Sequence, residues 1–457
     1  MMRSLFSGVS GLKNHQTRMD VIGNNISNVN THGFKSSRVT FQDMLSQTIA
    51  GAAKPEENRG GVNPKQVGLG MTVASIDKIF TQGSLETTGN QTDLAISGDG
   101  LFIVADGDKN MYTRAGTFAL DKDGTLVNPA NGLKVQGWMA TTDNTGEKVI
   151  NSSGTVEDIV VPVYDKIPAR ETTNVRYKCN LDSKLPVLPP DATAQMRASA
   201  GVTTNIDVYD NLGDPHRLTL NIWKTDTNQW TASAAVTDTE GPVTLDIPAG
   251  ANQENQENTS SRINLRFTPE GRLVSVADES SPDESNQGSL IANLNYRVAG
   301  DPSVRNIRLD LGSSGLAEGI TQFSSPSTTK AVEQDGYSMG YMESFTIDNS
   351  GIITAVYTNG TKQAVGQVAT AVFTNQQGLE NVGENLYEVS NNSGLPNIGP
   401  AAEAGRGKVV AGTLEMSNVD LSEQFTDMII TQRGFQANSR TITTSDQMLQ
   451  ELINLKR

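Results

Sequence analysis

Long apolar stripes with heptad-like spacing lie at both ends of the chain, and they constrain the fold more than any other feature of the sequence. Apolar side chains recur at steps of three and four over residues 3–30 and again over the last forty residues, which predicts two long helices. Asp420 and Glu423 form a capping box where the second helix should begin. The stripe residues are Leu5, Val9, Leu12, Met19, Ile22, Ile26, Val29, Leu421, Phe425, Met428, Phe435, Ile442, Leu449 and Ile453.

Polar residues interrupt both stripes. Gln16 stands at one step of the first stripe, and Gln432, Ser439 and Asp446 stand in the second. The two helices could pack on each other within one domain, or they could complete their seam with other copies of the chain. The interruptions leave each stripe too polar to be buried by one partner helix alone, so they favour assembly with other copies.

Between its ends the chain has the texture of a β protein. Short alternating segments are separated by Gly, Asn and Asp turns, as in residues 93–138 and 343–373, and such segments predict hairpins. The fold class is therefore mainly β with α-helical termini. We predict a terminal helical domain (1–30 and 418–457), a connecting segment (31–75), a middle β domain (76–161 and 331–417) and an inserted outer β domain (162–330). The connecting segment is rich in Gly and Pro, and it can act as a flexible loop, as a contact with neighbouring copies, or as both.

Charge and hydropathy exclude several classes of partner. The chain has 36 Lys and Arg against 51 Asp and Glu, and its net charge of −15 disfavours binding to nucleic acid. No run approaches the ~20 apolar residues that a membrane span needs, so membrane insertion is not expected. The first residues, MMRSLFSGVSGLKNHQ, have no apolar core and no cleavage site of a secretory signal. A route of export, if there is one, should leave the N-terminus uncut.

No motif of a conventional enzyme or cofactor site is present. The Gly-x-Gly pairs lack the third glycine of a dinucleotide loop, and Asp121 and Asp123 lack the glutamate that would complete a calcium loop. His15, His32 and His216 fall in separate regions, so they predict neither a metal site nor a triad. We therefore expect no metal, no cofactor and no enzymatic activity.

A short motif after the first stripe carries a resemblance to a known family. Residues 24–35, NNISNVNTHGFK, resemble the N-terminal signature of the bacterial flagellar axial family, and the last helix resembles the family's C-terminal helix. The stretches YTRAGTF, VYDNLGDPHRLTL and TQFSSPSTTKAVEQDGYSMG resemble the hook proteins of that family in particular. Asparagines near a helix end can bond its backbone groups, and a glycine permits the following turn. The motif residues are Asn24, Asn25, Asn28, Gly33 and Phe34.

The resemblance implies a function and a set of partners. It implies a self-assembling subunit of a curved tubular joint that transmits torque from motor and rod to filament. The terminal helices would form an inner coiled-coil layer. The partners would be other copies, the rod below, the hook–filament junction proteins above, and the hook cap and flagellar export apparatus during assembly. The location would be the flagellar hook, in the periplasm for a spirochaete and otherwise outside the cell.

Two alternatives to the hook remain open on the sequence alone. The distal rod subunit has the same ends, but the resemblance implies that rod proteins lack a large insertion, so the block 162–330 disfavours it. A secreted β-rich adhesin or enzyme with helical ends belongs to a different class, and it would need a receptor surface or a catalytic group.

Cys179 is the single cysteine, so it can form no disulfide within the chain. It can be a small buried hydrophobe, or the neighbouring Arg176 and Lys178 can provide a polar setting that lowers the pKa of its thiol. Its surroundings resemble spirochaete-type hook proteins, in which a cysteine becomes dehydroalanine and a lysine of a neighbouring subunit adds to it, giving lysinoalanine. Lys166, Lys178 and Lys184 are all near in sequence; the resemblance selects Lys166, with Asn180 as the assisting neighbour.

Overall fold

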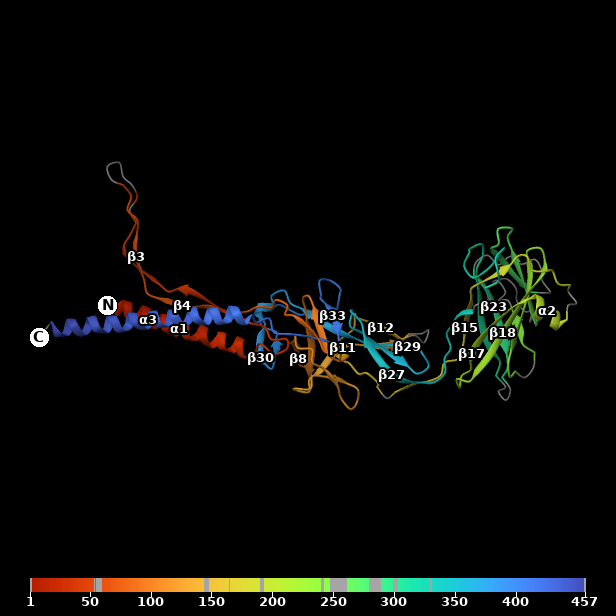
Figure 1. Ribbon diagram of the computed structural model, residues 1–457, viewed down its shortest axis with the longest axis horizontal. Coiled ribbons are helices and arrows are strands. Elements are labelled where there is room, and N and C mark those ends of the chain that lie inside the picture. The colour runs from red at the N-terminus through yellow and green to blue at the C-terminus, as the bar shows by residue number, and fades with distance from the viewer. Residues whose placement is uncertain are drawn as a thin grey trace. The chain divides into compact units, whose positions relative to one another are not determined.

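The computed structural model describes most of the chain. The described residues are 2–52, 54, 60–107, 109–143, 148–163, 165–189, 193–239, 242–246, 261–278, 289–298, 303–328 and 331–455. The chain forms two compact units (Figure 1). Unit 1 comprises Met1–Val163, Ser344–Val356 and Lys362–Arg457, and unit 2 comprises Tyr164–Glu343 and Tyr357–Thr361.

Unit 1 combines the two terminal helices with a β domain. Its helices are α1 (Met2–Ser27) and α3 (Leu421–Asn454), with a short 3-10 turn, η1 (Gln376–Gly378). Its early strands are β1 (Ser37–Asp43), β2 (Ser46–Ala50), β3 (Lys65–Gly68), β4 (Met71–Lys78), β5 (Leu85–Thr87), β6 (Leu94–Ser97), β7 (Leu101–Asp106), β8 (Lys109–Thr113), β9 (Ala119–Leu120), β10 (Leu126–Val127), β11 (Lys134–Thr142), β12 (Lys148–Ile150) and β13 (Glu157–Asp158). Its late strands are β28 (Ile352–Tyr357), β29 (Lys362–Val372), β30 (Glu380–Gly383), β31 (Leu386–Glu388), β32 (Asn397–Pro400), β33 (Lys408–Ala411) and β34 (Thr413–Glu415).

The β domain of unit 1 is built from both halves of the chain. Strand β29 from the second half pairs with β11 and β7 from the first half, while β33 pairs with β6 and β34 with β5. One apolar cluster of its core contains Ile103, Trp138 and Phe373, which also come from both halves. The mainly β fold with helical ends predicted from the sequence is confirmed.

Unit 2 is a sandwich of two five-stranded sheets around one core. The sheet orders are β20-β23-β24-β15-β26 and β17-β18-β19-β21-β22. Trp230 is fully buried in this core and donates its indole N–H to Gln322 Oε1 (3.1 Å). The elements are β14 (Lys166–Ile167), β15 (Asn174–Tyr177), β16 (Cys179–Asp182), α2 (Ala194–Ala200), β17 (Val202–Tyr209), β18 (Pro215–Asp226), β19 (Gln229–Val236), β20 (Thr244–Asp246), β21 (Arg262–Phe267), β22 (Leu273–Asp278), β23 (Ser289–Tyr296), β24 (Arg305–Ser313), β25 (Ile320–Phe323), β26 (Ala331–Gln334) and β27 (Gly340–Ile347), the last of which runs on into unit 1.

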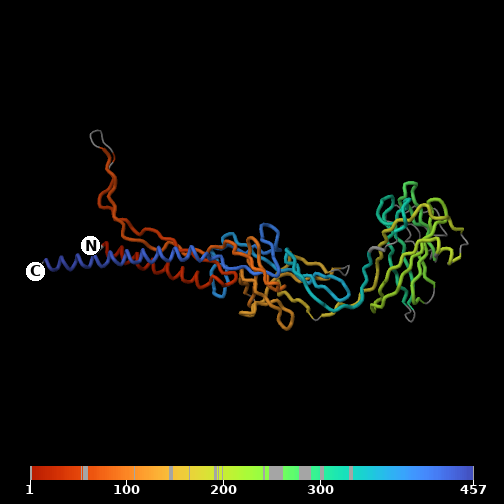
Figure 2. Tube along the Cα trace, in the orientation of Figure 1, coloured from red at the N-terminus to blue at the C-terminus, as the bar shows by residue number. Residues whose placement is uncertain are grey.

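The two terminal helices lie side by side and antiparallel (Figure 2). Ser4 Oγ lies 3.4 Å from Ser445 Oγ, and near the other end of α1 the Arg18 guanidinium pairs with Asp427 at 2.9 Å. Between these contacts the helices approach closely at glycines. A Cβ on Gly434 would lie 2.8 Å from the His15 ring, and one on Gly11 would lie 2.6 Å from the Asn438 amide. Small residues therefore let the helix backbones come together.

The contact between α1 and α3 does not bury all of the predicted apolar stripes. Thr431 and Ser445 are the buried residues of α3, whereas Phe425 and Phe435 are exposed. On α1, Ile22 is buried while Val9 is 53 % exposed. The helices do pack on each other within the chain, and they still leave large apolar side chains in solvent.

The connecting segment folds into strands. Strand β1 pairs with β4, both strands lie against α1, and β2 pairs with β3 in a hairpin. Every residue of β2 and β3 is exposed, including Ile49 and Val67. Part of the Gly- and Pro-rich stretch, residues 53 and 55–59, lies outside the described residues.

Several predicted turns are confirmed by their geometry. Asp121 O accepts the N–H of Gly124 at 2.9 Å between β9 and β10, and Asp348 O accepts that of Gly351 at 3.0 Å between β27 and β28. Gly124 and Gly351 both have φ of +80°, which glycine adopts without a steric penalty. The N-cap at Asp420 is confirmed too, because Asp420 Oδ1 accepts the N–H groups of Ser422 and Glu423.

The predicted inserted domain, 162–330, can be tested by excision. Lys166 of β14 pairs with Tyr341 of β27, and Ile167 pairs with Gly340, so the chain enters and leaves unit 2 on adjacent strands. Replacing residues 168–339 by Asn-Gly would join Ile167 to Gly340 through a two-residue hairpin turn. We expect the shortened chain to keep both helices and to unfold cooperatively in urea, as measured by circular dichroism. Loss of cooperative unfolding would show that unit 1 depends on the excised residues.

Candidate assembly and cross-link sites

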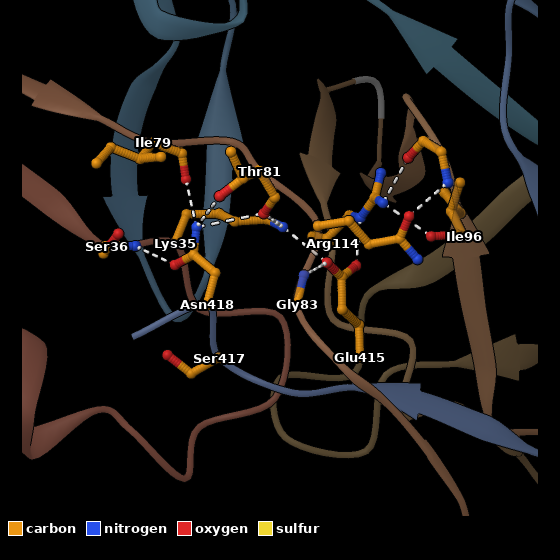
Figure 3. Close-up of polar contacts among 12 residues, drawn as sticks. Lys35, Ser36, Ile79, Thr81, Gly83, Ile96, Arg114, Glu415, Ser417 and Asn418 are labelled. Atoms are coloured by element: carbon orange, nitrogen blue, oxygen red, sulfur yellow. Dashed lines mark hydrogen bonds and ion pairs between the residues drawn. The ribbon is translucent and has the colours of Figure 1, made fainter. Parts of the chain in front are cut away.

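A buried ion cluster joins the two ends of the chain in unit 1 (Figure 3). Glu415, at the end of β34, accepts a hydrogen bond from Lys35 Nζ at 2.7 Å on Oε1 and one from Arg114 Nε at 2.5 Å on Oε2. All three side chains are at most 5 % exposed. Lys35 follows α1, Glu415 precedes α3, and Arg114 follows β8. The cluster therefore fixes both helices to the β domain.

Backbone groups provide further hydrogen-bond partners for this cluster. Lys35 Nζ also donates to Thr81 O (2.8 Å), and Glu415 Oε1 also accepts the N–H of Gly83 (2.9 Å). The Arg114 guanidinium donates to the carbonyls of Ile96, Gly98 and Gly100. A buried charge is tolerated only when it is paired and hydrogen-bonded, and this cluster meets both conditions.

The charges in the cluster shift one another's titration. Burial raises the pKa of Glu415, but the positive charges of Arg114 and Lys35 and their hydrogen bonds outweigh burial, so the pKa lies below its ordinary value of 4.5. Burial lowers the pKa of Lys35, and the Glu415 carboxylate opposes this shift. The stabilisation from Glu415 is complete above the pKa of the unfolded carboxyl and is lost as the pH falls through the folded pKa.

The asparagine and glycine motif binds the C-terminal end of α1 to neighbouring elements. Asn25 is 1 % exposed, and its amide donates to Ser37 O (2.8 Å) and Gln424 Oε1 (3.0 Å) while its Oδ1 accepts the N–H of Ser37 (2.9 Å). Gly33 has φ of +71°, and a Cβ there would lie 2.5 Å from the backbone nitrogen of Ala115. Its own N–H donates to Glu415 O at 2.8 Å. Asn25 and Gly33 therefore link α1 to β1, α3 and β34.

The other motif residues have smaller roles. Asn28 Nδ2 bonds the Asn24 carbonyl at 2.9 Å, which closes the last turn of α1, while the Asn24 side chain is exposed. Phe34 is buried, and the Lys78 ammonium lies 5.6 Å from its ring centroid. Sequence reasoning missed Lys35, Arg114 and Glu415 as a cluster. The signal was available for two of them, since Lys35 ends the quoted motif and Arg114 lies in YTRAGTF.

Exposed apolar side chains cover the outer faces of the terminal helices. On α1 they include Phe6 and Val9, at 65 % and 53 % exposed. On α3 they are Leu421, Phe425, Ile429, Ile430, Phe435, Met448, Leu452 and Ile453. Of the predicted stripe, Ile22 is buried; Leu5, Leu12, Met19, Ile26, Val29, Met428, Ile442 and Leu449 are partly buried; and Val9, Leu421, Phe425, Phe435 and Ile453 are exposed. So many exposed apolar residues on two neighbouring helices indicate a protein–protein contact surface.

Cys179 lies in the core of unit 2, which agrees with the first alternative, a small buried hydrophobe, and not with a polar setting. The side chain is 4 % exposed and belongs to the cluster of apolar residues between the two sheets. Arg176 and Lys178 are exposed, because residues alternate in and out along the strand and even positions here face solvent. Burial raises the pKa of the Cys179 thiol to about 12. The thiol is therefore protonated at neutral pH.

Lys166 and Asn180 occupy contrasting positions. Lys166 is exposed on β14. The Asn180 amide donates to Ser325 O (3.1 Å) and Ser325 Oγ (2.9 Å), and its Oδ1 accepts the N–H of Phe323 (2.9 Å). Asn180 thus fastens the segment after β25 beside Cys179. The exposed amine and the buried thiol are the two groups that the predicted cross-link needs.

The histidines are dispersed, as the sequence indicated. His15 of α1 faces α3, and its ring packs against Phe41 in a T-shaped arrangement. His216 is buried in strand β18. Within the described part of the chain, no group of three or more His, Cys, Asp or Glu is placed to hold a metal ion. None of the described helices is long and apolar enough to cross a membrane.

Family models match four regions of the chain. They are the "Flagella basal body rod protein" model over residues 5–35, the "Flagellar hook protein FlgE/F/G D1 domain" over 95–158, the "Flagellar basal body protein FlaE D2 domain" over 180–337, and the "Flagellar basal body rod FlgEFG protein C-terminal" over 410–455.

Whole-length relatives agree with these matches. The chain is 51 % identical to the flagellar hook protein FlgE of Treponema pallidum and 47 % identical to that of Borreliella burgdorferi, each over all of both chains. The crystal structure of the Helicobacter pylori flagellar hook protein FlgE2 superposes with a TM-score of 0.51 at 16 % identity, over 72 % of this chain and all of that one, and it supports the fold.

The insertion by itself does not separate hook from rod. A Bacillus subtilis protein described as flagellar basal-body rod protein FlgG is 31 % identical over the whole of both chains, so the premise that rod proteins lack this block is wrong for that relative. The higher identity to the two spirochaete hook proteins favours the hook over the rod.

Glu415→Gln tests the buried cluster. The substitution keeps the size of the side chain but leaves Lys35 and Arg114 as buried charges without a counter-charge, so we expect a loss of about 3–5 kcal/mol in the free energy of unfolding. Urea unfolding at neutral pH would measure it. Glu380→Gln, at an exposed position of β30, is the control and should change the value by less than about 0.5 kcal/mol. Equal, small effects of the two variants would contradict the assigned role.

Proposed function

The chain belongs to the flagellar hook protein FlgE family, and from this premise we propose that its copies join through their terminal helices into a curved tube that acts as a universal joint. The chain is a structural subunit and not an enzyme. The tube would transmit torque from the motor and rod to the filament. It would meet the rod below and the hook–filament junction proteins above, and the cap and export apparatus would act during assembly.

The outer faces of α1 and α3 carry this proposal. Phe425 is 50 % exposed and Ile429 56 % exposed on α3, and Phe6 and Val9 are exposed on α1. Burying such side chains between subunits contributes about 25 cal/mol per Å² of apolar surface removed from water. Glycines and polar residues contribute to the internal α1–α3 contact, as at Gly11 and Gly434, and the apolar side chains named above stay exposed.

Location follows from the same premise. The family places the chain in the flagellar hook. We propose that it is exported through the flagellar apparatus without cleavage. The hook would lie in the periplasm if the source is a spirochaete, as the identity to the Treponema and Borreliella proteins suggests.

Phe425→Asp tests assembly through α3. Phe425 is half exposed in the single chain, so the substitution should leave the subunit folded, with a melting temperature close to that of the unchanged chain. In the tube it would bury a charge in an apolar seam at a cost of several kcal/mol, and polymerisation should fail. Electron microscopy and sedimentation would measure tubes. Phe425→Leu keeps the apolar contact and should polymerise; tubes from Phe425→Asp would refute the proposed seam.

We also propose that neighbouring subunits become joined by lysinoalanine between Cys179 and Lys166. A base takes the Cα proton of Cys179, the Cα–H electron pair forms the Cα=Cβ bond, and the Cβ–Sγ pair leaves with sulfur as hydrosulfide. The neutral amine of Lys166 from a second copy then adds to Cβ; Cα gains a proton and the nitrogen loses one. The net change is loss of hydrogen sulfide.

The environment of Cys179 supports the first of these steps. Because burial keeps the thiol protonated, sulfur can leave as the monoanion and not as the sulfide dianion. Lys166 is exposed, so its amine is accessible from outside the subunit. We infer that assembly, and not the free subunit, brings the amine to the buried Cβ, with Asn180 holding the strand in place.

Cross-linking should be visible as resistance to denaturation. Assembled tubes should give a ladder of multimers after boiling in detergent and reductant, and alkaline pH should speed its appearance because the attacking amine must be neutral. Cys179→Ala and Lys166→Arg should each reduce the ladder to monomer while tubes still form. Lys178→Arg, the matched control, should keep the ladder. An intact thiol at Cys179 in mature tubes, measured by mass spectrometry, would exclude the cross-link.

A further inference from the structure

An exposed segment of unit 2 lies along strand β16, which begins at Cys179. Strand β25 pairs in parallel with one edge of β16 and is its partner strand among the described elements. After β25 the chain turns back over residues 324–328, here called the strap, and Thr328 forms an antiparallel bridge with Asn180 of β16. All strap residues except Ser327 are exposed. The strap therefore lies at the surface of the domain whose core contains the Cys179 side chain.

Hydrogen bonds hold the strap to β16. The N–H of Asn180 donates to Thr328 Oγ1 (3.1 Å), and Asn180 O accepts the N–H of Thr328 (3.1 Å). The N–H of Asp182 donates to Ser327 Oγ (3.0 Å). Two of these three bonds end on side-chain hydroxyls, and no strap residue belongs to the apolar cluster of the core. A segment held by exposed hydrogen bonds with little apolar burial opens at a low cost in free energy.

The same bonds fix the direction of the Cys179 Cα–H bond. Along an extended strand, successive residues direct their N–H and C=O groups to opposite edges, and each Cα–H bond points away from its own N–H and C=O. Because Asn180 and Asp182 direct their N–H groups to the strap, Cys179 directs its own toward β25. In agreement, Thr321 Oγ1 of β25 donates to Cys179 O at 3.4 Å. The Cα–H bond of Cys179 therefore points to the strap, although its side chain faces the core.

We propose that the strap is a removable cover over the Cα–H bond of Cys179, and that its opening controls the elimination step. This inference rests on the proposed cross-link. When the strap lifts, hydroxide from the solvent reaches the Cα proton at the edge of β16, without passing through the apolar core. Hydroxide takes that proton and becomes water, the Cα–H electron pair forms the Cα=Cβ bond, and sulfur leaves as hydrosulfide with the Cβ–Sγ pair.

A closed strap limits how fast sulfur is lost. The observed rate of elimination is the rate in the open state multiplied by the fraction of subunits whose strap is open. Each hydrogen bond between the strap and β16 lowers that fraction. Removing one of these bonds should therefore speed elimination, whereas removing a bond elsewhere in unit 2 should not.

Thr328→Val tests the inference at one bond. The substitution removes the hydroxyl that accepts the Asn180 N–H and keeps the branched shape of the side chain. In assembled tubes of the full-length chain at alkaline pH, hydrosulfide release, followed with a sulfide-sensitive fluorescent probe, should become about fivefold faster, the ratio that corresponds to one hydrogen bond. Ser327→Ala removes the acceptor of the Asp182 N–H and should act in the same direction. An unchanged or slower release in both variants would overturn the inference.

Thr203→Val is the matched control. Thr203 is exposed on β17, and its hydroxyl donates to Asn221 Oδ1 at 2.9 Å, so the substitution removes a comparable bond of the same domain away from the strap. Hydrosulfide release should proceed at the rate of the unchanged chain. Acceleration equal to that of Thr328→Val would show a general loosening of unit 2 and would overturn the inference.

Backbone amide exchange shows whether the opening is local. In the folded subunit, hydrogen–deuterium exchange measured by mass spectrometry should be about fivefold faster at the amides of Asn180 and Asp182 in Thr328→Val, and unchanged in β18 and β19. Equal acceleration throughout unit 2 would indicate a merely structural effect of the substitution. Faster exchange at β16 without faster hydrosulfide release would show that the strap opens but does not control elimination. Either result would refute the proposed cover.

The remaining outcomes distinguish this inference from the proposal beneath it. If the unchanged chain and the strap variants release no hydrosulfide and give no ladder, the proposed cross-link fails and the inference fails with it. If the unchanged chain cross-links and the strap variants release hydrosulfide at its rate, the cross-link stands and the role of the strap is refuted.

Discussion

The buried contact of Glu415 with Lys35 and Arg114 is the interaction on which the rest of unit 1 depends. Helices α1 and α3 come from opposite ends of the chain, and the sequence between them forms two β units. A carboxylate shared by a lysine after α1 and an arginine of the β domain anchors the end of α1 and the start of α3 to that domain. Because each charge would be costly to bury alone, the three groups are stable only together, and this selects one arrangement of the helices on the β domain.

With the helices fixed in this way, one part of their surface forms the α1–α3 contact and another part remains exposed. Glycines, which have no side chain, let α1 and α3 approach each other, as at Gly11 and Gly434. The larger apolar side chains, such as Phe425, remain outside. A helix pair that buried its whole apolar stripe internally would be a finished domain, whereas this pair leaves part of the stripe exposed. In the proposed tube, other copies would cover these exposed side chains.

The burial of Cys179 changes which reaction its thiol is suited to. A low thiol pKa suits a nucleophile, but Cys179 is proposed to lose its sulfur and not to attack with it. A buried, protonated thiol suits that loss, because its sulfur can leave as hydrosulfide and not as the sulfide dianion. The core of unit 2 would then serve as a protected store for a reactive position, used only after neighbouring subunits are in place.

The sequence by itself determined the helical ends, the β class, the cap at Asp420 and the turns at Gly124 and Gly351, because each depends on local spacing or on one residue's backbone freedom. It also identified the motif that contains Asn25 and Gly33. It could not show that Glu415 meets Lys35, since 380 residues separate them. Nor could it place Cys179, whose sequence neighbours are cationic while its neighbours in space are apolar. Only the tertiary structure decided these points, because strand alternation sends adjacent residues to opposite faces and the partners of a buried charge come from distant parts of the chain.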